Sequence, residues 1–116
     1  ACAAVGRILG RGWRLVWQSR SGNPRTPWLE PDVNAALAEE KDKGARAVVI
    51  CPIGFISDHV EVMYDLDLEA AQTCRDLGLT MSRAGTVNDH PVFVKALADL
   101  VRGQIARGEA KTTAQA

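Results

Sequence analysis

A chain of 116 residues, 47% of them apolar, is long enough for one small domain with a buried core. Fourteen basic side chains balance fourteen acidic ones, and aromatic residues make up 5% of the chain, so the composition argues against nucleic-acid binding. No run approaches the roughly 18 consecutive apolar residues of a membrane span, and the first residues lack the apolar core of a signal peptide, so we expect a cytoplasmic protein without a transmembrane segment.

The first part of the chain is predicted to contain two helices separated by a strand and a long loop. A helical pattern covers residues 3–9, and the apolar run WRLVW at 13–17 predicts a short strand. A polar loop rich in glycine and proline occupies 18–31. The second helix opens at Pro31-Asp32 and runs to about Lys43, before a glycine.

The second part of the chain repeats the order of strand and helix. The apolar run AVVICPI at 47–53 predicts a strand covered on both faces, as in a parallel sheet. A helix follows to about Leu77, where Gly78 ends it, and a short strand covers 79–83. The last helix runs from Pro91 to about Arg107.

This alternation predicts the fold class α/β, with a parallel sheet in a three-layer α/β/α arrangement. We expect one domain over residues 1–108 and a flexible tail at 109–116. Ligands of such sheets bind beyond the carboxyl ends of the strands. Two loops are predicted at that edge, 18–31 and 54–59.

The stretch SDHVEVMYDLDLE, residues 57–69, holds five carboxylates and no basic side chain. Glu61, Asp65 and Glu69 recur every fourth residue, so they lie along one helix face, where like charges cost roughly 0.2–0.5 kcal/mol per pair. We interpret Ser57 or Asp58 as the helix cap and expect the remaining aspartate, residue 67, to point elsewhere.

The acidic row has two interpretations. It forms either a solvated helix face or, beside a ligand-binding edge, a series of oxygen ligands for a divalent cation or a proton relay. His59 is likewise either a structural histidine or a functional group at the mouth of the row. An irregular π-turn near residues 62–67 would reorient the carboxylates, although no sequence pattern reveals one.

The loop at 18–31 combines polar donors with an apolar wall. Gln18, Ser19 and Arg20 follow the first predicted strand, and Trp28-Leu29 stands between two prolines. Such a loop could hold a flat apolar ligand that carries carboxylates, or it is an ordinary loop packed down by its tryptophan. The chain has no GxGxxG or Walker A motif, so nucleotide binding is not predicted.

Three stretches together carry a family resemblance: WQSRSGNPRTPWLEPDV, VVICPIGFISDHVEVMYDLDLEA and VNDHPVFVKALADLV. In this order they closely resemble the C-terminal half of ferrochelatases, and they extend over nearly the whole chain. The resemblance implies one of two Rossmann-like domains that enclose a porphyrin, into which the enzyme inserts ferrous iron in heme biosynthesis. It also implies that the other half of the cleft belongs to an N-terminal domain missing from this chain, which we therefore expect to be inactive alone.

The resemblance also implies roles for individual residues. Glu61 matches the catalytic carboxylate that takes pyrrole protons or handles the metal, with His59 beside it as a second catalytic residue. Asp65 and Glu69 match an acidic row along a π-helical segment, so the predicted metal-binding residues are Glu61, Asp65 and Glu69. The predicted porphyrin-binding residues are Gln18, Ser19, Arg20, Trp28 and Leu29.

The resemblance leaves the porphyrin open between protoporphyrin IX and coproporphyrin III, the latter being frequent in high-GC bacteria. Iron enters as a substrate, and we expect no tightly bound cofactor and no iron–sulfur cluster, because the C-terminal residues contain no cysteine. Cys2, Cys51 and Cys74 are widely spaced and are expected to be reduced and mostly buried. The alternatives are a non-catalytic metal- or tetrapyrrole-binding module and a cobalt chelatase.

Overall fold

The computed structural model describes the backbone of residues 1–115 and the side chains of residues 1–109. The chain forms two compact units, Ala1–Thr86 and Val87–Ala116. The predicted domain boundary after residue 108 and the flexible tail at 109–116 stay predictions. Ala116 and the side chains from residue 110 onward lie outside the described part of the chain.

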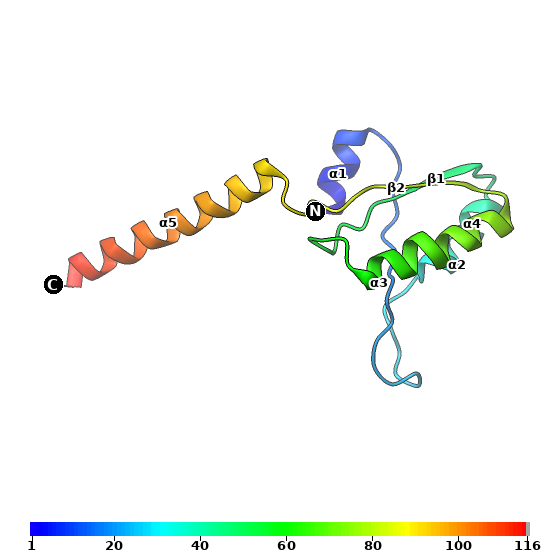
Figure 1. Cartoon of the computed structure of the whole chain (residues 1–116), viewed down its shortest axis with the longest axis horizontal. Helices are drawn as coiled ribbons and strands as arrows, with labels where there is room; N and C mark the ends of the chain where they lie inside the picture. The colour runs from blue at the N-terminus through cyan, green and yellow to red at the C-terminus, as the bar shows by residue number, and fades with distance from the viewer. Residues whose placement is uncertain (116) are drawn as a thin grey trace. The chain divides into compact units, whose positions relative to one another are not determined.

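The first unit carries most of the secondary structure (Figure 1). Its elements are, in chain order, α1 (Cys2–Leu9), α2 (Val33–Asp42), β1 (Ala47–Ile50), α3 (Val60–Val62), the π-helix η1 (Met63–Ala70), α4 (Ala71–Leu77) and β2 (Thr80–Arg83). The second unit contains α5 (Pro91–Gln115). This helix continues past the predicted end at Arg107, because the alanine, lysine and glutamine of the last stretch favour helix.

Strands β1 and β2 pair in parallel, with Ala47 opposite Thr80 and Ile50 opposite Arg83. The chain passes from one to the other through α3, η1 and α4. Parallel neighbours joined through helices confirm the predicted α/β class. The carboxyl ends of both strands therefore lie at the same edge, where the 51–59 loop begins.

The strand predicted at 13–17 is wrong. Only its last residue pairs, in an isolated bridge between Trp17 and Asp32. The Trp17 N–H donates to the Pro31 carbonyl, and the Val33 N–H donates to the Trp17 carbonyl, each at 2.9 Å. Val16 packs against the core, but Trp13, Arg14 and Leu15 are exposed, so most of the apolar run has no packing surface that would favour a strand.

The core lies between the helices and the inner face of the sheet. Val62, Leu66, Ala70 and Cys74 recur every fourth residue as a fully buried stripe. This stripe packs with Val33 and Leu37 of α2, with Leu79, and with the partly buried side chains Val48 and Ile50 of β1. Figure 1 draws α2, α3 and α4 on one side of the two strands.

The outer face of β1 is more open than the predicted three layers imply, since Val49 is 72% exposed. The alternating burial along both strands shows one packed face and one open face. The continuous apolar run therefore does not correspond to a strand covered on both sides in this chain. The expectation of mostly buried thiols holds for Cys74, whereas Cys2 is partly exposed and Cys51, directly after β1, is exposed.

Two predicted helix boundaries are confirmed. Asp32 caps α2, accepting a hydrogen bond from the Asn34 N–H at 2.8 Å. Gly78 ends α4 in the left-handed conformation, with φ of 65°. The predicted cap at Ser57 or Asp58 is wrong: α3 begins after His59 and has no side-chain cap. The Asp58 carboxylate bonds elsewhere, as described below.

Candidate functional site

The acidic row stands on a helix with one wide, irregular section. Over Met63–Ala70 the helix is of the π type, and the Ala71 N–H donates to the Leu66 carbonyl five residues back. This confirms the π-turn raised as a possibility from the sequence. The carboxylates are spaced four residues apart, which is slightly more than one α-turn of about 3.6 residues, so in a regular α-helix they would drift around the axis. A π-turn contains more residues, and it keeps Glu61, Asp65 and Glu69 closer to one line.

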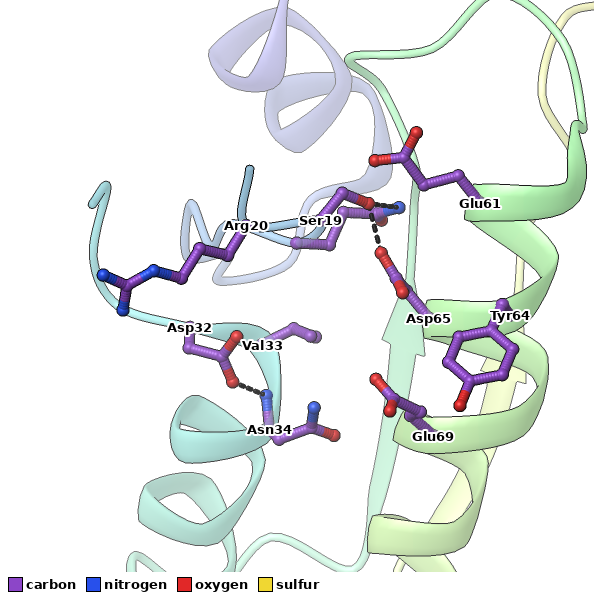
Figure 2. Close-up of a pocket in the computed structure, with 10 residues that line it drawn as sticks. Ser19, Arg20, Asp32, Val33, Asn34, Glu61, Tyr64, Asp65 and Glu69 are labelled. Atoms are coloured by element: carbon purple, nitrogen blue, oxygen red, sulfur yellow. Dashed lines mark hydrogen bonds between the residues drawn. The ribbon is translucent and has the colours of Figure 1, made fainter. Parts of the chain in front are cut away.

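The three carboxylates face one open cavity of about 420 Å³. Its other wall comes from the segment after Trp17 and from the start of α2. Figure 2 shows Glu61, Asp65 and Glu69 one above the other on the helix, facing this wall. The lining residues are Gln18, Ser19, Arg20, Asp32, Val33, Asn34, Glu61, Tyr64, Asp65 and Glu69.

Ser19 joins the two walls of the cavity. Its hydroxyl donates a short hydrogen bond to the Asp65 carboxylate (Figure 2). Its backbone has φ of 61°, a left-handed conformation that costs a non-glycine residue roughly 1–2 kcal/mol. Strain of this kind clusters at functional sites, and here it turns the hydroxyl toward the acidic row.

Arg20 stabilises its own loop. One guanidinium nitrogen donates to the carbonyls of Pro24 and Thr26, at 2.5 and 2.7 Å. Figure 2 shows the side chain pointing away from Asp65 and Glu69. Arg20 therefore does not neutralise the row, although it lines the cavity.

The predicted porphyrin-binding residues divide between two neighbouring cavities. Gln18 and Ser19 line the acidic cavity, whereas Trp28 and Leu29 line a second one of about 300 Å³. Arg20 and Asp32 border both cavities. The structure thus brings these residues onto one continuous surface, and their role in binding stays a prediction.

His59 lies apart from the cavity lining. Its ring packs edge-on against Phe55, with 4.8 Å between ring centroids, and the side chain is half-buried. As the N-cap residue of α3 it stands two residues before Glu61. It does not line the cavity that holds the three carboxylates, and its catalytic role stays a prediction.

The sequence interpretation missed Arg83, at the carboxyl end of β2. Its guanidinium donates to Asp58 at 2.9 Å and, through two nitrogens, to both oxygens of Asp67. These hydrogen bonds, that of Asp67 foremost, raise the pKa of Arg83 above its ordinary value, so the guanidinium stays charged. The position of Arg83 at the end of a predicted strand could have revealed it. The carboxyl ends of parallel strands lie at the same edge of the sheet, so Arg83 is expected near the loop after β1.

The row is not a closed metal site. Among the described residues, no group of three or more histidine, cysteine, aspartate or glutamate side chains is arranged to hold a metal ion. The carboxylates instead follow one another along the cavity wall. Such an arrangement can accept protons and can contact a hydrated cation in passing, since oxygen ligands bind divalent iron more weakly than thiolates do.

Comparisons with known proteins agree on one family. The sequence model of the family "Ferrochelatase" matches residues 2–105. The ferrochelatase of Rhodopirellula baltica is 51% identical over 108 residues, which are 92% of this chain and 29% of the relative.

Two further relatives carry a more specific name. The coproporphyrin III ferrochelatase of Propionibacterium freudenreichii is 50% identical over 99 residues, covering 85% of this chain and 28% of the relative. That of Streptomyces coelicolor is 54% identical over 89 residues, covering 77% and 24%. The chain thus spans between 24% and 29% of the length of these relatives.

In the described part of the chain, no helix is long and apolar enough to cross a membrane.

Proposed function

The chain belongs to the ferrochelatase family, and we propose that it forms the acidic wall of an enzyme that inserts ferrous iron into a porphyrin. The observation that carries the proposal is the row of three carboxylates along one open cavity. Because the chain spans less than a third of its relatives, we propose that it is inactive without the remainder of the enzyme.

The chemistry of metal insertion suits this wall. Two pyrrole nitrogens lose protons while a hydrated dication loses water, so a base beside the macrocycle and a path for the protons both help. We assign the first role to Glu61, in the first turn of α3. Asp65 and Glu69 continue along the helix from it, and we propose that they deliver iron or remove protons.

We propose coproporphyrin III as the first porphyrin to test, because two of the relatives described above are named for it. Its propionates would reach polar donors near Gln18 and Ser19, while the macrocycle would lie against Trp28 and Leu29. Protoporphyrin IX is the comparison ligand.

The proposal includes a cytoplasmic enzyme without a resident cofactor. The three cysteines are unpaired, as is usual in a reducing compartment. Iron is treated as a substrate, and the absence of an iron–sulfur cluster stays a prediction.

A chimera tests the proposal: this chain replaces the matching segment of the Rhodopirellula baltica ferrochelatase. Metalloporphyrin formation from ferrous iron is followed by absorbance without oxygen, with each porphyrin in turn. The chimera is expected to insert iron, and Glu61→Gln is expected to lower kcat/KM by roughly 100-fold or more. Glu39→Gln, an exposed glutamate on α2 outside the cavity, is the matched control and should leave kcat/KM unchanged.

Three results would contradict the proposal. A folded chimera that binds porphyrin but inserts no metal favours the non-catalytic binding module. Insertion of cobalt without iron favours the cobalt chelatase. Normal activity of the Glu61→Gln variant at limiting and saturating iron removes Glu61 from the mechanism.

A further inference from the structure

The carboxylates of residues 57–69 are divided by a buried side chain. Asp65 precedes Leu66 and lines the cavity, whereas Asp67 follows Leu66 and meets Arg83. Leu66 itself is fully buried. The two aspartates therefore leave the helix on different sides of the stripe that anchors it to the core.

Arg83 connects two points that are nine residues apart in the chain. Asp58 lies just before the N-cap of α3, and Asp67 lies inside η1. The Arg83 side chain is 15% exposed, compared with 27% for Asp58 and 38% for Asp67. A guanidinium largely withdrawn from water and bonded to both carboxylates forms stronger hydrogen bonds than an exposed lysine pair would.

The backbone of Arg83 is fixed as well. Arg83 is opposite Ile50 in the parallel register, and the next N–H, of Ala84, donates to the Ile50 carbonyl at 2.8 Å. The guanidinium also donates to the Ala84 carbonyl at 3.2 Å. The guanidinium that bonds the two aspartates thus belongs to a residue whose backbone is fixed in the sheet.

We propose that Arg83 is a positioning residue that fixes the rotation and the π-type winding of η1, so that Asp65 and Glu69 stay in line with Glu61 along the cavity. The geometry supplies the reason. Replacing one π-turn by an α-turn removes a residue from that turn and rotates every following side chain. Asp67 would then leave the plane of the guanidinium, so the paired hydrogen bonds favour the wide turn over the regular one.

The first test measures winding without reference to the reaction. In the chimera described above, amide hydrogen exchange is compared between η1 and α4 for the parent and for Arg83→Gln. The variant is expected to exchange about tenfold faster over Met63–Ala70, with α4 changed by less than about twofold. Arg75→Gln, an exposed arginine on α4 bonded to Gln72, is the matched control and should change neither segment.

The second test measures positioning in the reaction and rests on the proposed function. Arg83→Gln is expected to raise the KM for iron about tenfold and to leave the KM for porphyrin within about twofold. A loss of folded protein alone would lower the maximal rate and leave both KM values unchanged. Arg83→Lys keeps the charge but not the fork, so it should restore only part of the parent behaviour.

The outcomes separate the two ideas. An inactive parent chimera contradicts the proposed function, while the exchange experiment still decides the role of Arg83. Unchanged exchange over η1, unchanged KM for iron, or full rescue by lysine each overturns the positioning role. If Arg83→Gln does not fold, Asp67→Asn tests the same bond, and faster exchange in η1 but not in α4 is again the expected result.

Discussion

Asp65 and Asp67 flank the same buried leucine on the same helix, and they have opposite environments. Asp65 faces an open cavity with two other carboxylates in line and accepts a hydrogen bond from the Ser19 hydroxyl. Asp67 faces a guanidinium anchored in the sheet. Asp67 is therefore bonded to the sheet, whereas Asp65 faces the open cavity.

One acidic stretch can thus serve two purposes. Like charges at a spacing of four weaken a helix, and Arg83 offsets part of this cost without entering the row. A basic residue bonded to the row itself would neutralise the carboxylates that the proposed reaction needs. Arg83 lies on the other side of Leu66, where it holds the helix through Asp67 without neutralising the row.

The largest expected effect concerns the leucine that separates the two sides. Leu66→Ala removes a fully buried side chain and should lower the free energy of unfolding by about 2–5 kcal/mol, measured in urea. Leu68→Ala, on the exposed face of the same π-helix, should cost less than about 0.5 kcal/mol. Equal costs would show that the buried stripe does not anchor η1.

The next effect compares the two aspartates directly. Asp67→Asn weakens the bonds to a mostly buried guanidinium and should cost about 1–2 kcal/mol, the lower range allowing for partial exposure of Asp67. Asp65→Asn lowers repulsion within the row and should change stability by less than about 0.5 kcal/mol. The free energy of unfolding of both variants is measured in urea. A larger loss of stability for Asp65→Asn than for Asp67→Asn would contradict the structural role given to Asp67.

A smaller effect tests the strained residue opposite the row. Ser19→Ala loses the hydrogen bond to Asp65 and keeps the left-handed strain, for a cost of about 1 kcal/mol. Ser19→Gly loses the same bond but relieves about 1 kcal/mol of strain, so its stability should be close to that of the parent. The contrast is measured by thermal unfolding, and an alanine variant as stable as the glycine variant would contradict it.

The smallest effect provides an exposed ion pair for comparison with Arg83. The pKa of Glu40 is lowered, first by the hydrogen bond from Lys43 and then by Arg14. Its contribution to stability is therefore present above its ordinary value of 4.5 and is lost as the pH falls through the lowered pKa. In an NMR titration this pKa should return toward its ordinary value in high salt, because the pair is exposed to solvent. A pKa that does not respond to salt would contradict this.

Local signals predicted part of the fold correctly. The cap at Asp32, the end at Gly78 and the parallel pairing of β1 with β2 each follow from residues close in sequence or from the order of elements. The strand at 13–17 failed because an apolar run becomes a strand only where a partner edge and a packing surface exist. That condition depends on tertiary structure.

The sequence predicted the acidic row of the candidate site but not Arg83, which holds the helix that carries the row. The spacing of Glu61, Asp65 and Glu69 is visible in any helix, and the structure gives all three one cavity. Arg83 is separated by 16 residues from Asp67 and by 25 from Asp58. Only the parallel register brings it beside them, so helical periodicity had no means of revealing it.

Hydrogen bonds join the two ends of the loop between Trp17 and α2, and further hydrogen bonds hold its interior. Backbone hydrogen bonds join Trp17 to Pro31 and Val33, and the Arg20 guanidinium holds the carbonyls of the intervening turn. Within the tip, residues 21–30, Gly22 takes a positive φ of 86° and the Asn23 side chain accepts a hydrogen bond from the Arg25 N–H, so these two residues also shape the loop. A ligand that meets Trp28 and Leu29 would therefore find a surface that is already ordered, which lowers the entropic cost of binding it.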